Sequence, residues 1–249
     1  MEPPAGKVEV DQASVNALLR LDNVVECTVV ERLNRFVVKV FRGSTEALAH
    51  TNNTGSLRGV LERGRRAYCL PKASGKTGFR LVAVECPVGA AALIDTTLQM
   101  RAFEEALARD LIPWLRGCRL ARRNPRVGDS VLDYLLDCGG RPTYVEVKSA
   151  VLRLGDGTAS YPEPASARGR RHVRVLTRLS MEGYRALLVF IAAIPGSKGF
   201  RVNSRADSLL PRLLLEASLK GVVIKALSLY YDPQARLVLL ENPDLPVLL

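Results

Sequence analysis

The chain has few of the features that mark a secreted, membrane-spanning or zinc-binding protein. Its five cysteines are scattered along 249 residues, and none forms a C-x-x-C pair, so a zinc site has little support. Most lie in apolar stretches, where we expect buried thiols that pack as small hydrophobic side chains. The longest fully apolar run, Ala186 to Ile194, is about half a membrane span. The first residues lack the basic and apolar regions of a signal peptide, so we expect a soluble, cytoplasmic protein with no membrane partner.

Basic side chains outnumber acidic ones in this sequence. The sequence holds 36 Lys and Arg against 25 Asp and Glu, a formal net charge of +11, and 28 of the 36 are Arg. A protein this basic meets a polyanion, and nucleic acid is the commonest one. Arginine suits phosphate because its planar guanidinium donates two parallel hydrogen bonds. A basic proteome or an Arg-rich, heat-adapted surface would produce the same totals.

The sequence divides into two parts of different character. From about Val24 to Val88 it reads as short β-rich segments separated by glycines, which favours a small barrel of the five-stranded oligonucleotide-binding (OB) type. After this stretch, strand and helix patterns alternate, which is typical of an α/β domain with a mixed sheet. We therefore predict an α+β protein of two domains, 1–88 and 89–249. A single domain with a β-rich extension is the alternative.

Hydrophobic periodicity predicts the elements of the second part. We expect a helix over Ala91–Leu115, a basic loop over 116–126, an apolar strand at 130–137 and a second strand at Thr143–Leu152. The later elements are a helix ended by Gly183, a buried strand over Ala186–Ile194, a helix at 207–220 and a strand at 221–231.

The strand "TYVEVKSAVL" carries an acid and an amine at alternate positions. Side chains on a strand alternate between its faces, so Glu146 and Lys148 project from one face and Val145 and Val147 from the other. An ion pair on a solvated face would explain this pattern. The preceding apolar strand, however, contains Asp133, and a lone carboxylate there is costly to desolvate. A short turn joins the two strands, so we expect them to be antiparallel neighbours that bring the three polar groups together.

This D…E-x-K arrangement resembles that of the restriction-endonuclease-like PD-(D/E)xK nucleases. Two carboxylates suit Mg²⁺ or Mn²⁺, hard cations that take oxygen ligands, and an adjacent lysine would orient the attacking water. Asp129 and Asp137 compete for the first position, but both lie at expected strand ends, where solvated acids are common.

Several motifs in order resemble the sugar fermentation stimulation protein family, whose members are described as DNA-binding. The matching segments are "ERLNRFVVKV", "HTNNTGSL", "RGRRAYCL", "LIDTTL", "LDYLL", "YVEVKSA", "YPEPASARGRRHVRVL" and "GVVIKAL". The resemblance covers nearly the whole chain and implies an OB-like barrel followed by a nuclease-like domain. The chain departs from the family pattern at Glu163 and Pro164, where Asp-Ala is usual, and at Arg171, where Lys is usual.

The resemblance also implies roles for individual residues. Asp133 and Glu146 take the metal-holding positions, and Lys148 completes the catalytic set. Arg168, Gly169 and His172 keep the R-G-x-x-H pattern. Arg168, Arg171 and His172 share a helical face by their spacing, which we interpret as a phosphate-contacting face; a solvated basic face is the alternative. The barrel signature consists of His50, Asn53, Thr54 and Gly55. It is either functional or a turn device, because Asn and Thr hydrogen-bond to nearby backbone.

Other residues complete the expected nucleic-acid surface. Arg119, Arg122 and Arg123 lie in the expected basic loop, where they would grip phosphates without reading sequence. Glu104 or Glu105 on the preceding helix would be the source of any further carboxylate. The residues Trp114, Tyr144 and Tyr161 are too sparse to predict a base-stacking platform.

The sequence therefore predicts a DNA-binding protein that hydrolyses phosphodiester bonds with Mg²⁺ or Mn²⁺ and has little sequence specificity. Two alternatives stay open. One is a non-catalytic DNA-binding or regulatory protein, linked to sugar metabolism, that keeps the nuclease-like core as a scaffold. The other is an RNA-processing factor, because the barrel and the arginines suit either nucleic acid.

Overall fold

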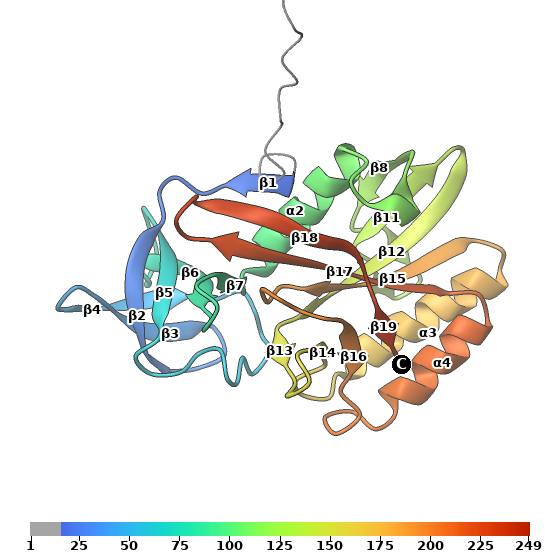
Figure 1. Cartoon of the computed structure of the whole chain (residues 1–249). Coiled ribbons are helices and arrows are strands. Elements are labelled where there is room, and N and C mark those ends of the chain that lie inside the picture. Colours follow the sequence, from blue (N-terminus) through green and yellow to red (C-terminus); the bar gives the residue numbers. More distant parts are fainter. Residues whose placement is uncertain (1–15) are drawn as a thin grey trace, which may run out of the picture.

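The computed structural model describes residues 16–249, which form a barrel at one end of the molecule and an α/β domain at the other (Figure 1). The barrel strands are β2 (Val25–Arg32), β3 (Val37–Arg42), β4 (Thr45–His50), β5 (Arg66–Pro71) and β6 (Phe79–Glu85). The barrel closes because β4 pairs in parallel with β6, while the other neighbours are antiparallel. The expected five-stranded barrel is confirmed; β4 is the strand that the sequence pattern did not indicate.

The second domain is built on a mixed sheet, as predicted. Its strands are β8 (Cys118–Arg123), β11 (Tyr134–Cys138), β12 (Arg141–Ala150), β15 (Arg185–Ala192), β17 (Val223–Asp232) and β18 (Leu237–Leu245). The central strands β12, β15 and β17 are parallel, and β8, β11 and β18 pair antiparallel at the two sides. The short strand β7 (Ala91–Leu93) pairs with both β6 and β17, so one continuous sheet runs through both domains.

Helices cover both faces of this mixed sheet. Helix α2 (Thr96–Ala108) lies on one face, and α3 (Ala167–Met181) and α4 (Leu210–Leu219) lie on the other (Figure 1). Strand β15 is apolar at nearly every position because both of its faces are buried. Leu187 and Val189 pack in the core that contains α2, whereas Leu188 and Phe190 pack in the core of α3 and α4.

Short elements complete the fold. They are β1 (Ala17–Arg20), the 3-10 helix η1 (Pro113–Leu115), β9 (Arg126–Val127), β10 (Ser130–Val131), β13 (Leu152–Arg153), β14 (Ala159–Tyr161), β16 (Phe200–Val202) and β19 (Val247–Leu248). Strand β1 pairs with β18, while β13, β14, β16 and β19 form a small separate sheet. Across residues 16–249, every helix is too short or too polar to cross a membrane.

The helix predicted over Ala91–Leu115 is only partly correct. Residues 91–93 form β7, and α2 begins after Asp95, whose side chain accepts a hydrogen bond from the Leu98 amide (2.9 Å) and caps the helix. The helix ends at Ala108, and Pro113 begins η1 instead. The apolar residues of β7 share the helical spacing by chance, because a buried strand and a buried helix segment look alike over so few residues.

The segment predicted as a basic loop contains an edge strand. Strand β8 occupies Cys118–Arg123 and pairs antiparallel with β11. This pairing places Cys118 opposite Cys138, and the two form a disulfide across 20 residues of sequence. The prediction of buried thiols was therefore wrong for this pair. Cys27, Cys69 and Cys86 are free thiols.

Candidate active site

The hairpin of β11 and β12 brings the acidic and basic side chains of the predicted site together. Tyr134 is opposite Val145 in the antiparallel register, so Asp133, just before β11, lies next to Glu146. Val145 and Val147 pack in the core on the α2 side, and Glu146 faces α3. The predicted alternation of the strand is confirmed. Its polar face is nevertheless covered rather than solvated, since Glu146 is only 2% exposed.

One carboxylate oxygen of Glu146 is held by two basic side chains. Its Oε1 contacts Nζ of Lys148 and Nδ1 of His172, and these two nitrogens are 3.4 Å apart. Its Oε2 is buried without a hydrogen-bond partner in the described part of the chain. Burial opposes ionisation of Glu146, but the hydrogen bond from His172 and the positive charge of Lys148 outweigh it and lower its pKa. Glu146 is thus an anion with one free oxygen.

Asp133 is the second carboxylate of the cluster. The expected strand over 130–137 is interrupted at Leu132 and Asp133, and this bend allows Asp133 Oδ2 to accept a hydrogen bond from the Val147 amide (2.7 Å). Burial and the nearby negative charge of Glu146 raise the pKa of Asp133 to about 6. Two acids that repel each other in a desolvated place are a typical setting for a cation.

The donor set fits a hard divalent cation. Within residues 16–249, no three side chains of His, Cys, Asp or Glu are grouped so as to hold a metal by themselves. Mg²⁺ does not require such a group, because it keeps several waters and binds through one or two carboxylates. Asp133 and the unpartnered Oε2 of Glu146 would provide these oxygens.

Helix α3 contributes residues to this cluster and to the surface beside it. The Ser166 hydroxyl accepts a hydrogen bond from the Gly169 amide (2.9 Å) and begins the helix. His172 is buried against Glu146, whereas Arg168 and Arg171 are exposed. The common face that their spacing predicted is therefore divided: the histidine points inward to the acid and the arginines point to solvent.

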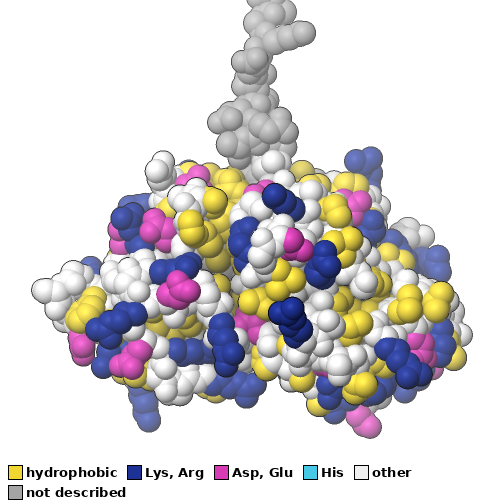
Figure 2. Space-filling view, turned by 60° about the horizontal axis from the view of Figure 1, so that its bottom comes forward, with side chains coloured by type: hydrophobic (Ala, Val, Ile, Leu, Met, Phe, Trp, Pro, Cys, Tyr) yellow, Lys and Arg dark blue, Asp and Glu magenta, His cyan; other side chains and the backbone are white. Residues whose placement is uncertain are grey.

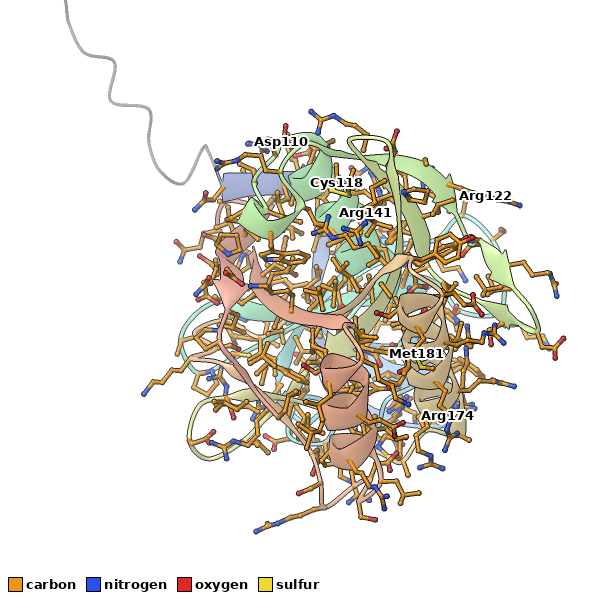
Figure 3. The ribbon with its side chains drawn as sticks, turned by 90° about the vertical axis from the view of Figure 1, so that its right-hand side faces the viewer. Asp110, Cys118, Arg122, Arg141, Arg174 and Met181 are labelled. Carbon is orange, nitrogen blue, oxygen red and sulfur yellow. A yellow bond between two sulfur atoms is a disulfide. The ribbon has the colours of Figure 1, made fainter. Side chains whose placement is uncertain are left out.

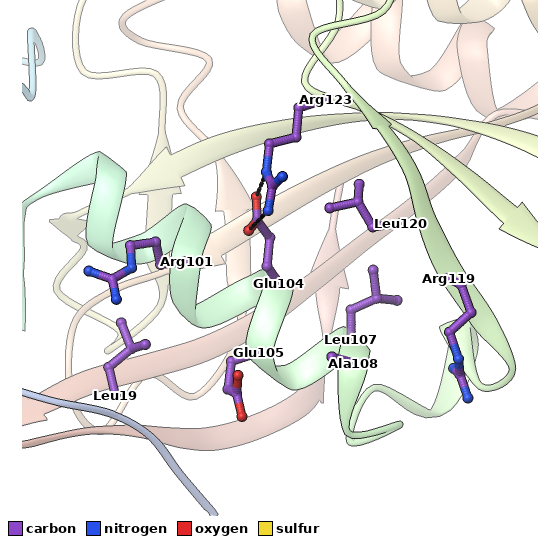
Figure 4. A pocket seen from close by; sticks show the side chains of 9 residues that line it. All are labelled: Leu19, Arg101, Glu104, Glu105, Leu107, Ala108, Arg119, Leu120 and Arg123. Carbon is purple, nitrogen blue, oxygen red and sulfur yellow. Dashed lines mark hydrogen bonds and ion pairs between the residues drawn. The ribbon is translucent and has the colours of Figure 1, made fainter.

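The three arginines of β8 differ in their surroundings. Arg119 and Arg123 line a pocket between α2 and β8, where Arg123 forms two hydrogen bonds with Glu104 (2.7 and 2.8 Å; Figure 4). Arg119 forms two hydrogen bonds with Asp110 (both 2.9 Å). Arg122 lies on the outer edge of the sheet and makes no ion pair within the described residues (Figure 3). Of the three, Arg122 has the guanidinium best placed to meet a phosphate.

Glu104 does not join the Asp133–Glu146 cluster. Besides Arg123 it binds the hydroxyl of Tyr134 (3.0 Å), whose ring stacks on Phe103 of α2. These contacts place it on the α2 face of the sheet, opposite the face that bears Glu146. Arg123 is the main cause of its lowered pKa. Glu105 lies beside Arg109 and lines the same pocket as Glu104.

The barrel signature forms a loop at the junction of the two domains. Asn53 accepts a hydrogen bond from the Gly55 amide (2.9 Å) and donates one to the Ile94 carbonyl (3.1 Å), so it acts as a turn device. Thr54 is exposed, and His50 is half-buried at the end of β4. A Cβ on Gly55 would lie 3.1 Å from Asn53 Oδ1 and 3.2 Å from Glu163 Oε1, which leaves little room for a side chain.

Two residues that sequence reasoning did not assign to this junction hold the loop in place. Arg32 donates to the carbonyls of Gly55, Ser56 (2.8 Å) and Asn53 (3.1 Å). Glu163, one of the two positions that depart from the family pattern, accepts hydrogen bonds from the Ser56 hydroxyl (2.5 Å) and the Leu57 amide. No sequence signal marks these contacts, because Ser56 and Glu163 are 107 residues apart.

Comparison with known proteins assigns the family. The model described as "SfsA N-terminal OB domain" matches residues 30–94, and "Sugar fermentation stimulation protein RE domain" matches 97–235. The chain belongs to the sugar fermentation stimulation protein family. The resemblance seen in the motifs is thereby confirmed, and so is the order of an OB barrel followed by a nuclease-like domain. The residue at which the two domains divide stays a prediction.

Relatives match over nearly their full length. A sugar fermentation stimulation protein homolog of Pyrococcus furiosus is 42% identical over 89% of this chain and 95% of its own. A homolog from Archaeoglobus fulgidus is 41% identical, and the match covers 93% of this chain and 99% of that protein. The solved structure of Pyrococcus furiosus SfsA in complex with Ca²⁺ has a TM-score of 0.88 at 40% identity, and the match covers 94% of this chain and 99% of that one.

Proposed function

We propose that this protein binds DNA and hydrolyses its phosphodiester bonds with Mg²⁺ or Mn²⁺, with little sequence specificity. The observation that carries the proposal is the buried Glu146 carboxylate, whose Oε2 has no partner in the described chain and lies next to a second acid, Asp133. A relative of the same fold is described in complex with Ca²⁺, a hard cation of the same ligand preference.

Each residue of the cluster has a chemical task in this reaction. Asp133 and Glu146 would hold the cation, which, when bound, lowers the pKa of a water and offsets charge on the phosphoryl group. The Lys148 ammonium would orient the attacking water and counter the negative charge that develops on phosphorus. His172 positions the Glu146 carboxylate through its hydrogen bond.

The surface provides cations for the DNA backbone. Lys and Arg side chains are spread over both halves of the face in Figure 2, rather than gathered in one stripe. Arg168 and Arg171, on the exposed side of α3, and Arg122, on the edge strand, would contact phosphates. Such contacts carry no base information, so we expect binding that weakens steeply as the salt concentration rises.

The second candidate is a DNA-binding or regulatory protein without catalysis. One observation favours it: Glu146 Oε1 is already paired with Lys148 and His172, so one half of this carboxylate is satisfied without any metal. Under this reading the cluster is a buried polar scaffold. RNA is the alternative polyanion for either candidate.

The test is cleavage of plasmid DNA and of single-stranded DNA in Mg²⁺, Mn²⁺ or EDTA. We expect metal-dependent nicking that falls at least about 100-fold in Glu146→Gln and Lys148→Ala, because each change removes a group that acts on the reacting phosphate. Glu104→Gln is the matched control, since this acid lies on the opposite face of the same sheet, and its cleavage should stay within about twofold of wild type. DNA binding without cleavage in either metal would establish the scaffold reading.

A further inference from the structure

An aromatic pair, of which Phe36 is exposed and His50 half-buried, lies on the barrel near the domain junction. Phe36, in the turn between β2 and β3, is 47% exposed, and its ring is parallel to that of His50 at the end of β4, with centroids 6.4 Å apart and an interplanar angle of 5°. The Arg35 guanidinium is 6.0 Å from the Phe36 centroid. Packing in the hydrophobic core does not explain why Phe36 is aromatic, because its ring lies exposed beside the Arg35 guanidinium. Aromatic faces of this kind are the surfaces on which unstacked bases lie.

The aromatic pair borders a groove between the two domains. The Thr51 amide donates to the Phe36 carbonyl (2.9 Å), and the residues that follow Thr51 form one wall of a cavity of about 440 Å³. The barrel side of this groove includes Arg35, Asn52 and Thr54, and the opposite side includes Ser149, Tyr161 and Arg168.

The far end of the groove reaches the candidate active site. Ser149 directly follows Lys148 on β12, with its side chain on the opposite face of the strand, and its hydroxyl oxygen is buried without a hydrogen-bond partner in the described chain. Tyr161 lies on the same side of the sheet as Lys148, because its ring is 5.6 Å from that of Phe190, which pairs with Lys148 in the register of β12 and β15. A strand that entered over Phe36 and passed Tyr161 would therefore approach the face of the sheet that bears Glu146.

The charges that line the groove suit a phosphate backbone. Arg35 and Arg168 form no ion pair with any acid in residues 16–249. The carboxylate among the lining residues is Glu163, which is engaged by Ser56 and Leu57 and lies near the Arg32 guanidinium. The groove thus offers two unpaired cations at opposite walls and polar amide and hydroxyl groups between them.

We propose that this groove binds a single-stranded segment of DNA, with one base stacked on Phe36 beside His50 and the backbone held between Arg35 and Arg168. Bases in a duplex are already stacked on one another, so an aromatic platform on the protein surface reaches only an unpaired base. The choice of DNA, and the passage of the strand toward Glu146, rest on the proposed function. The stacking platform itself rests on the geometry of Phe36 and its neighbours.

The experiment measures binding of a fluorescent oligo-dT by anisotropy, with a duplex of equal length as the second ligand, in EDTA so that nothing is cleaved. Phe36→Ala should weaken single-strand binding about tenfold, or about 1.4 kcal/mol, and change duplex binding by less than twofold. Phe36→Tyr should restore binding because it keeps the ring. The matched control is Leu33→Ala, since Leu33 is an exposed apolar residue of the same turn (46%) without a ring, and it should bind like wild type.

The possible outcomes are distinct. The proposal is overturned if Phe36→Ala binds the single strand as tightly as wild type does. It is also overturned if Phe36→Ala loses as much affinity for the duplex as for the single strand. Neither result bears on the proposed nuclease function. Tighter binding of the matching oligo-U than of oligo-dT overturns the choice of DNA. A Phe36-dependent preference for single strands in a protein that never cleaves supports this inference and refutes only the catalytic function.

Discussion

At the scale of single residues, the contact between His172 and Glu146 decides how the cluster can act. His172 is 3% exposed and its Nδ1 faces Glu146 Oε1, so it fixes the orientation of a carboxylate that would hold the metal. Loss of such a supporting group typically costs 10- to 100-fold in metal affinity. We expect His172→Ala to weaken Mn²⁺ binding by about this factor, measured by calorimetric titration of the full chain.

The control for this change is on the same helix. Arg174→Ala alters an exposed residue of α3 on its solvent side (Figure 3) and should leave Mn²⁺ affinity within about twofold of wild type. If His172→Ala binds Mn²⁺ as wild type does, His172 has only a packing role. His172→Asn, which retains a side-chain donor, should recover part of the affinity and separates orientation from loss of bulk.

Residue-scale prediction from sequence succeeded where a local rule applies. The alternation of a strand was enough to place Glu146 and Lys148 on one face, opposite Val145 and Val147. It could not show that α3 buries this face, because that depends on the packing of the helix onto the sheet. For the same reason the inward orientation of His172 was not predicted: helical spacing alone groups it with Arg168.

At the scale of elements, the edge strand β8 is fastened to its neighbour by a disulfide. Cys118 and Cys138 are separated by 20 positions in the sequence, and a cross-link of this span stabilises the native state by roughly 3 kcal/mol, mainly by constraining the unfolded chain. We expect the double variant Cys118→Ala/Cys138→Ala to lose about this much free energy of unfolding in urea. The free energy of unfolding of the wild-type protein should fall by the same amount when a reductant is added.

A free cysteine provides the comparison for this prediction. Cys86→Ala changes a half-buried thiol outside the disulfide and should leave the response to reductant unchanged. Under denaturing, non-reducing conditions, three of the five cysteines should react with an alkylating agent. If all five react, and reductant has no effect on wild type, the disulfide is absent.

Element-scale prediction failed at β8 for an identifiable reason. Its sequence, "CRLARR", has too many exposed charges to show the period of a buried strand. An edge strand needs only one face covered, and charged side chains on edges discourage pairing with other chains. The partner strand β11, with alternate buried residues Tyr134 and Leu136, was predicted in part, since residues 134–137 of the expected strand belong to it and it lies inside the sheet.

At the scale of the whole molecule, the two domains were predicted from composition and periodicity, but their attachment was not. The barrel and the mixed sheet share a continuous ladder through β7, and the loop 51–57 is held between Arg32 and Glu163. These contacts join residues far apart in sequence, which no local pattern reports. Gly55 and Glu163 also line the groove in which we propose that a single strand binds.

Glu163 is the residue on which this attachment should depend most. Its carboxylate accepts hydrogen bonds from the Ser56 hydroxyl and the Leu57 amide, and hydrogen bonds to a charged group contribute roughly 1.5–3 kcal/mol each when well shielded. Glu163 is half-buried, so solvent reduces this contribution. We expect Glu163→Ala to lower the free energy of unfolding by about 2 kcal/mol and to speed hydrogen exchange at the amides of Gly55 and Leu57.

Exchange in the central strand β15 should stay as slow as in wild type, because its hydrogen bonds lie within the sheet. Ser56→Ala removes one of the two donors and should have a smaller effect, whereas unchanged protection at Leu57 in Glu163→Ala would show that the loop is held by Arg32 and the barrel alone.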